Sequence, residues 1–238
     1  SPVWYQPKNG SFIDIETGAA ALPDSFNSDL EAIIPSSESQ QEVWSAAQLG
    51  DDASCAFNES VSVKLTGQID IGALRDAIRD VGLRHKAMRA SISPDGSLVK
   101  ISRNPTIELN VLETSDPAPV IANDVVTAFD LVRGPLFRFS LVPVSTKEHI
   151  LVMTAHHIVC DGWSSYLILK ELGNRYRANT GSEAPVLPKP DDLGEYNTAA
   201  ADLAETEAED FWLDEYETIP PVIDFPTDVA RPALRTFD

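Results

Sequence analysis

The sequence predicts an α+β fold in which a mixed β-sheet is flanked by helices. Segments that alternate strictly between apolar and polar residues, as strands do, are interspersed with amphipathic segments of helical period. The two kinds do not follow the regular strand–helix–strand order of a doubly wound parallel sheet. The chain has 238 residues, of which 43% are hydrophobic. That is enough for one large domain with a sizeable core.

The first half of the chain carries one clear strand and two helix starts. Residues 1–35 are punctuated by proline and glycine and show no persistent period, which indicates an N-terminal linker or irregular arm. Residues 36–40 offer a capping hydroxyl followed by a glutamine, which predicts the start of the first helix. Residues 59–65 alternate strictly and predict a strand. Asp70 can cap a helix over 71–84, whose apolar residues recur at helical spacing.

The second half continues with short strands and two further helices before an acidic C-terminal part. From Asp191 to Glu217 there are eleven acidic and no basic residues, which is typical of a solvated face on a helix. The other expected elements are short strands at 88–92, 98–102 and 107–112, a strand pair at 136–142 and 149–154, helices over 120–130 and 163–177, a loop over 179–190 and an acidic helix and extended segment over 191–238.

Charge and composition exclude several classes of partner. The net charge of −19 repels phosphate backbones and anionic lipids, so nucleic-acid and membrane partners are not expected. No apolar run approaches the ~20 residues of a membrane helix, and the N-terminus lacks the features of a secretory signal. Cys55 and Cys160 lie far apart without a CxxC pattern, which disfavours a disulfide framework or a zinc cluster. A cytoplasmic protein is expected, and the absence of an initiator Met suggests a piece of a longer chain.

One segment carries recognisable chemistry, an apolar strand that runs into His156 and His157 and then into Asp161 and Gly162. Side chains alternate along a strand, so one histidine can face a cleft while the other packs inward. A positioned imidazole can accept a proton near neutral pH, and the carboxylate can orient the ring or pair with an arginine. Gly162 permits a tight turn. Because adjacent histidines on a strand diverge, a metal site is disfavoured.

A bare histidine pair is most simply two buried, hydrogen-bonded core residues, but the four fixed residues of HHxxxDG arise by chance in about one in a thousand sequences or fewer. The motif resembles the active-site motif of the condensation domains of nonribosomal peptide synthetases, which belong to the chloramphenicol-acetyltransferase-like superfamily. Other segments resemble this family in the same order. They are residues 35–44 (a Ser/Thr-x-x-Gln-x-x-hydrophobic-Trp helix start), 84–89 (RHExLR, with Lys86 where Glu is usual), 193–196 (the start of the fourth motif, without its usual Trp) and 225–232 (the LPTDRPRP stretch).

The resemblance covers about residues 30–238 and implies a chloramphenicol-acetyltransferase-like lobe. Residues 36–190 would form the N-terminal lobe of a two-lobe condensation domain, and 191–238 would lead to a missing C-terminal lobe. Residues 48–60 are most similar to condensation domains of hybrid polyketide–peptide synthetases. The implied reaction is amide formation between a carrier-bound acyl thioester and a carrier-bound aminoacyl acceptor.

The resemblance also implies roles for individual residues. His157 would be catalytic and face the substrate tunnel, whereas His156 would be structural. Asp161 would hold the loop through a salt bridge with Arg84. Arg89 would be a second partner for Asp161, and more simply a structural pair, and Gly162 would keep the loop open with its N–H near the reacting carbonyl. Apart from the resemblance, the usual burial of tryptophan predicts that Trp44 and Trp163 are core residues.

By the same resemblance the expected partners are donor and acceptor carrier proteins, whose phosphopantetheine arms carry the substrates, together with the C-terminal lobe and neighbouring synthetase domains. No cofactor or metal would bind directly. One lobe cannot enclose a tunnel, so the isolated chain is expected to be inactive. Two alternatives remain, a non-catalytic condensation-like interaction module and an ester-forming or CoA-dependent HxxxD acyltransferase. A cyclising relative is disfavoured, because those have Asp where this chain has His156.

Overall fold

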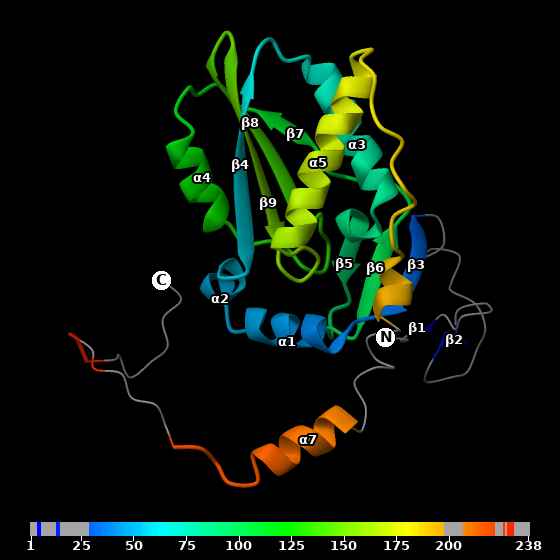
Figure 1. Ribbon diagram of the computed structural model, residues 1–238, viewed down its shortest axis with the longest axis vertical. Helices are drawn as coiled ribbons and strands as arrows, with labels where there is room; N and C mark the ends of the chain where they lie inside the picture. The colour runs from blue at the N-terminus through cyan, green and yellow to red at the C-terminus, as the bar shows by residue number, and fades with distance from the viewer. Residues whose placement is uncertain are drawn as a thin grey trace.

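A four-stranded sheet lies at the centre of the computed structural model, with strand order β4-β9-β8-β7 (Figure 1). Its first three strands are antiparallel, and β7 pairs parallel to β8, so the sheet is mixed as predicted. The strands are β4 (Asn58–Thr66), β7 (Leu109–Val111), β8 (Phe137–Ser145) and β9 (Glu148–His156). The residues that the structure describes are 4–5, 13–14, 29–197, 207–221, 226 and 228–230.

A second sheet is antiparallel and has three strands in the order β3-β6-β5. The sequence predicted one mixed sheet, whereas these strands form a sheet of their own. Residues 30–35, expected within an irregular arm, form β3 and pair with β6, and Ile33 is buried. Pairing with a distant strand fixes β3, which no local period could indicate. The strands of this sheet are β3 (Leu30–Pro35), β5 (Ala90–Ile92) and β6 (Leu98–Ser102). A 3₁₀ turn, η1 (Lys86–Arg89), precedes β5. Two further strands, β1 (Trp4–Tyr5) and β2 (Ile13–Asp14), pair separately.

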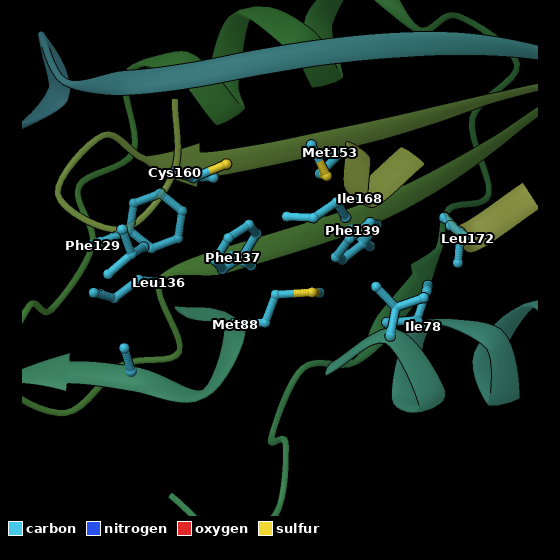
Figure 2. Close-up of a cluster of buried hydrophobic side chains, with 14 of the residues drawn as sticks. Ile78, Met88, Phe129, Leu136, Phe137, Phe139, Met153, Cys160, Ile168 and Leu172 are labelled. Atoms are coloured by element: carbon cyan, nitrogen blue, oxygen red, sulfur yellow. The ribbon is translucent and has the colours of Figure 1, made fainter. Parts of the chain in front are cut away.

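Two helices cover one face of the four-stranded sheet and pack against each other, α3 (Ile71–Arg84) and α5 (Gly162–Asn179). Both confirm the sequence prediction. The Asp70 side chain caps α3 by accepting the Ala73 N–H at 3.0 Å. Figure 2 shows the core between these layers, where Ile78 of α3 and Leu172 of α5 gather with Phe139 of β8 and Met153 of β9.

The opposite face carries α4 (Ala118–Val125), which lies across the sheet from α5 (Figure 1). It contacts β4 and β9, and it ends earlier than the predicted 120–130. The Asn58 side-chain amide donates to the Val125 carbonyl at 2.8 Å and to the Thr127 carbonyl at 3.0 Å. These bonds capture the carbonyl groups at the helix end, and the chain then turns so that Phe129 enters the core.

Two short helices lie below the sheet ends, α1 (Glu38–Ala47) and α2 (Asp51–Cys55) (Figure 1). The predicted start of α1 is confirmed, because Ser37 and Gln40 form a capping box. Trp44 packs against the core as expected, and Gly96 lets a turn approach its ring, since a Cβ there would lie 2.5 Å from the indole. Trp163 was expected in the core but is 70% exposed, because it lies on the outer face of the first turn of α5.

The acidic part contains α7 (Glu207–Glu215), which confirms helix in that region, although Leu203 and Ala204 lie outside the described residues. The prediction of an extended tail over 220–238 also falls largely outside them. Both Cys55 and Cys160 are free thiols. In the described ranges, no helix combines the length and apolar character that crossing a membrane requires.

Gly173 in α5 offers a test of this packing. A Cβ at this position would meet no atom within 4 Å, and the residue borders an apolar cavity of about 180 Å³. Gly173→Ala should therefore stabilise the chain by up to about 1 kcal/mol, the helix-propensity difference between the two residues. The measurement is the free energy of unfolding in urea.

Gly82→Ala in α3 is the matched control. Its Cβ would lie 2.9 Å from the Pro105 Cβ, so this variant should lose about 1–3 kcal/mol through overpacking. Equal losses in the two variants would contradict the packing of α5 described above.

Candidate functional site

The HHxxxDG motif occupies the turn between β9 and α5, where both elements end near α1 and α2 (Figure 1). His156 is the last residue of β9, and Gly162 is the first of α5. The His157 N–H donates to the carbonyl of Phe57, the residue just before β4, at 2.8 Å, so the pairing with that segment continues past the end of β9. The two histidines point apart, as strand alternation predicts, since His156 is 0% exposed and the His157 side chain is 42% exposed.

His156 is a buried, neutral imidazole. Its Nδ1 accepts the Ile158 N–H at 3.2 Å, so the ring proton of the neutral form lies on Nε2, which faces the Ser54 hydroxyl at 3.4 Å. The rings of Phe57 and Phe129 lie against it. Burial lowers the pKa of His156 from 6.5 to about 4, so the ring carries no charge near neutral pH. The ring is thus buried and uncharged, with both nitrogens directed at groups of the protein.

His157 has the opposite arrangement of its ring nitrogens. Its Nδ1 lies 2.9 Å from the Cys160 carbonyl oxygen, which can only accept, so Nδ1 carries the proton. Glu59 Oε1 lies 3.2 Å from the same nitrogen. Nε2 has no hydrogen-bond partner within the described part of the chain. On a side chain that is 42% exposed, the Nε2 lone pair is therefore able to accept a proton from a substrate.

The motif turn is held from α1 by a buried amide. Gln40 Nε2 donates to the Ile158 carbonyl at 3.1 Å. Its Oε1 accepts the Ser37 N–H and the Asn197 side-chain amide, both at 3.0 Å. The sequence indicated Gln40 as a capping residue and as the glutamine of the Ser/Thr-x-x-Gln-x-x-hydrophobic-Trp stretch over residues 35–44, without assigning it a contact to the motif turn. Its second role depends on a contact that no local pattern encodes.

Cys160 lies inside the turn and is chemically quiet. Its Sγ is 3.3 Å from the Ser165 hydroxyl, and burial raises the pKa of the thiol to about 11. It therefore remains protonated near neutral pH and serves the site through its backbone carbonyl. Among the described residues, no group of three or more His, Cys, Asp or Glu side chains gathers as metal ligands.

Asp161 caps α5 and does not form the expected salt bridge with Arg84. Its Oδ1 accepts the Ser164 N–H at 2.7 Å, and hydrogen bonds from Ser164 lower the pKa of the carboxyl. Arg84 Nε instead pairs with Glu171 at 2.8 Å, and the His85 ring contacts the same carboxylate. The reason is geometric, because the end of α3 packs against the middle of α5, away from the motif turn.

Arg89, the second candidate partner of Asp161, is also used elsewhere. Its side chain is 4% exposed, with Nη1 2.6 Å from Glu31 Oε2 and Nε donating to the Gly82 carbonyl at 2.9 Å. It ties β3 to the end of α3 as a structural pair. Lys86 lies 2.6 Å from Asp192, so the three basic residues of this segment stabilise the scaffold and lie apart from the motif turn.

Gly162 does not make the tight turn that its identity suggested. Its φ lies outside the left-handed region that favours glycine, which the chain adopts at other glycines such as Gly96. A Cβ at Gly162 would meet no atom within 4 Å. Its lack of a side chain therefore leaves open space at the start of α5. Beside it lies an exposed surface, here termed the α5 aromatic face, made of Trp163, Tyr166 and Leu167, which are 70%, 56% and 36% exposed.

Comparisons with known proteins identify the family. The family model for the condensation domain matches residues 30–238. Tyrocidine synthase 2 of Brevibacillus parabrevis is 30% identical over 230 residues, which cover 94% of this chain and 6% of that synthase. Phosphinothricin tripeptide synthetase PhsB of Streptomyces viridochromogenes is 29% identical, covering 91% of this chain and 19% of that protein.

Solved structures agree. The complex of the X-domain and OxyB from teicoplanin biosynthesis matches with a TM-score of 0.73 and 25% identity, covering 91% of this chain and 48% of that one. The condensation domain of Monacolin K polyketide synthase MokA matches with a TM-score of 0.67 and 24% identity, covering 87% and 46%. The chain thus spans about half the length of these structures and a small part of the synthetases. The resemblance inferred from HHxxxDG is confirmed, and the chain belongs to the condensation domain family of nonribosomal peptide synthetases.

Proposed function

We propose that this chain is the N-terminal lobe of a condensation domain that forms an amide bond between a carrier-bound acyl thioester and a carrier-bound aminoacyl acceptor. Condensation domains are acyltransferases. The observation that carries the proposal is the state of His157, whose Nδ1 is anchored by the Cys160 carbonyl while Nε2 has no partner among the described residues and the side chain is 42% exposed. An imidazole held in this way is prepared to accept one proton.

The proposed reaction needs only that one proton acceptor. An α-amine has a pKa near 8, so part of the acceptor is already neutral at pH 7. As its nitrogen attacks the thioester carbonyl, the amine proton passes to His157 Nε2. The tetrahedral centre then collapses, the C–S bond breaks, and the imidazolium returns the proton to the leaving thiolate. Base catalysis of this kind typically contributes about 10²–10⁴-fold.

Gly162 is proposed to admit the thioester carbonyl to the start of α5. The open space at this residue lets a carbonyl oxygen approach the Gly162 N–H. The first N–H groups of a helix have no partner inside the helix and carry partial positive charge. They would stabilise the oxyanion as it develops. Asp161 contributes by fixing the helix start through its bond to the Ser164 N–H.

A second lobe is proposed to complete the site. The His157 side chain is 42% exposed in this chain, whereas thioester aminolysis is favoured when water is excluded. The α5 aromatic face lies directly after the motif, and an exposed apolar patch is typical of an interaction surface. Covering it would enclose the reaction. The proposed partners are donor and acceptor carrier proteins with their phosphopantetheine arms and neighbouring synthetase domains, in the cytoplasm, with no cofactor held directly.

A second candidate is a non-catalytic interaction module. The similarity to the X-domain favours it, since that structure is of a complex with another protein, OxyB. The arrangement of His157 argues for catalysis, because an interaction surface alone has no need for an anchored ring with a free Nε2. An ester-forming or CoA-dependent acyltransferase would use the same residues with a hydroxyl acceptor, and the acceptor offered in the assay distinguishes it.

His157→Ala in the two-lobe enzyme should lower the rate of amide formation by at least about 10²-fold, because the proton acceptor and its positioning are lost. The melting temperature should change little, since this ring is 42% exposed. The assay uses donor- and acceptor-loaded carrier proteins with a melting curve for each variant. His156→Ala is the control and should destabilise the protein, because it empties a buried site.

Three outcomes would contradict the proposal. Unchanged amide formation in His157→Ala would favour the interaction module. Loss of activity in a stable His156→Ala, with His157→Ala active, would reverse the two assignments. Robust amide formation by residues 1–238 alone, which are expected to be inactive, would contradict the need for a second lobe.

Asp161→Ala should cost about 1 kcal/mol of unfolding free energy, the usual value of an N-cap, whereas Asp161→Ser should cost only a few tenths. In the folded chain the pKa of Asp161 lies below its ordinary value of 3.8. The ionised carboxylate therefore stabilises the fold at any pH above 3.8. The advantage of Asp161 over Asp161→Asn should then be lost as pH falls through the folded-state pKa. Urea unfolding of the 238-residue chain at pH 7 and pH 3 measures both effects. A loss of 3–5 kcal/mol for Asp161→Ala would instead indicate a broken buried ion pair.

A further inference from the structure

We infer that Glu59 is a positioning residue for His157, one that holds the ring and stabilises the imidazolium formed when Nε2 takes a proton. The inference rests on the proposed role of His157 as proton acceptor. Glu59 belongs to β4 and stands outside the HHxxxDG motif. Its Oε1 lies 3.2 Å from His157 Nδ1, on the side of the ring away from the free Nε2.

The strand register brings the two residues together. Glu59 is paired with Ala155 of β9, and residues directly opposite in a sheet share a face. Ala155 packs into the core beneath α5, so Glu59 lies on that face of the sheet. His157 follows Ala155 by two positions and projects to the same side. The backbone bond from the His157 N–H to the Phe57 carbonyl keeps these two segments of the chain in the same register beyond the end of β9.

Glu59 interrupts an apolar row, which points to a role other than packing. Alternation places Val61, Val63 and Leu65 on the same face of β4, and the last two line an apolar cavity with Leu151. A hydrophobic residue at the head of this row would fit the pattern. The Glu59 side chain is 32% exposed, and within the described residues His157 is its one ion-pair partner.

The two acceptors at His157 Nδ1 do different things. The Cys160 carbonyl at 2.9 Å is neutral and fixes the tautomer. The Glu59 carboxylate is negative, so its attraction grows when the ring becomes a cation. The same division occurs where a carboxylate orients a catalytic imidazole and stabilises the imidazolium.

The other titratable groups around His157 do not take this role. Asp161 lies in the same turn and interacts electrostatically with His157, but its carboxylate accepts the Ser164 N–H at the start of α5. Cys160 stays a thiol, since burial raises its pKa to about 11. His156, on the adjoining strand end, is neutral near pH 7 because burial lowers its pKa to about 4. Glu59 is thus the negative group in contact with the ring.

The test compares Glu59→Gln with Glu148→Gln, a matched control. Glu148 pairs with Lys64 at the other end of the same two strands and is 38% exposed, close to the 32% of Glu59. The titration of the His157 ring is followed by NMR in the 238-residue chain. Loss of the Glu59 charge should move the midpoint to lower pH by about 0.2–0.7 units, the range expected for an exposed ion pair. Glu148→Gln should leave it unchanged.

The second measurement is the pH profile of amide formation by the two-lobe enzyme. Glu59→Gln should lower the maximal rate by about threefold to tenfold, because the base is weaker and less well held. It should also move the acidic limb of the profile to lower pH, with KM for the acceptor carrier unchanged. Glu59→Asp keeps the charge and should retain the position of the limb. A purely structural role would lower the rate without moving the limb.

The outcomes separate this inference from the proposed function. Equal His157 midpoints in Glu59→Gln and Glu148→Gln would overturn the role of Glu59, whatever His157→Ala does to activity. A shifted midpoint, together with unchanged amide formation in His157→Ala, would support the contact between Glu59 and His157 and overturn the catalytic assignment instead.

Discussion

The bond from the Ile158 N–H to Nδ1 of buried His156 determines how the site is built. It turns the chain at the end of β9, and it requires a neutral ring, because a protonated imidazole has no acceptor nitrogen. Burial secures that state by lowering the pKa of His156 to about 4. The next residue then leaves the strand on the opposite side with its own Nδ1 bound to the Cys160 carbonyl. Two adjacent histidines thus acquire different tautomers and different exposure to solvent from the backbone around them.

Distant segments keep this turn in place. Gln40 of α1 donates to the Ile158 carbonyl, Phe57 just before β4 accepts the His157 N–H, and Glu59 of β4 places its carboxylate beside the ring. The HHxxxDG motif therefore contributes the proposed reacting ring and the helix start, while α1 and β4 contribute contacts that orient them. Each of these contacts is worth little alone, but together they hold the His157 ring through its Nδ1 and leave Nε2 without a partner among the described residues.

The elements that could be predicted are those encoded by local chemistry. Asp70 and Ser37 mark helix starts because a capping side chain bonds to the nearby backbone, and strict alternation marked β4 because one face of the strand lies against α3 and α5. Long-range partners could not be read in this way. The pairing of β3 with β6, the choice of Glu171 by Arg84 and the exposure of Trp163 depend on how separate elements cross. Glu59 was missed for the same reason, since only the register of β4 with β9 brings it to His157.

The most direct test of this account is the tautomeric state of the two motif histidines, measured by long-range ¹⁵N–¹H correlation NMR of the 238-residue chain at pH 7.5. The chain has four histidines; substitution of His85 and His149 identifies the remaining two signals, and His157→Ala tells these two apart. The account predicts that His156 carries its proton on Nε2 and remains neutral down to about pH 5, whereas His157 carries its proton on Nδ1. The same tautomer in both rings, or protonation of His156 near its ordinary value of 6.5, would contradict it.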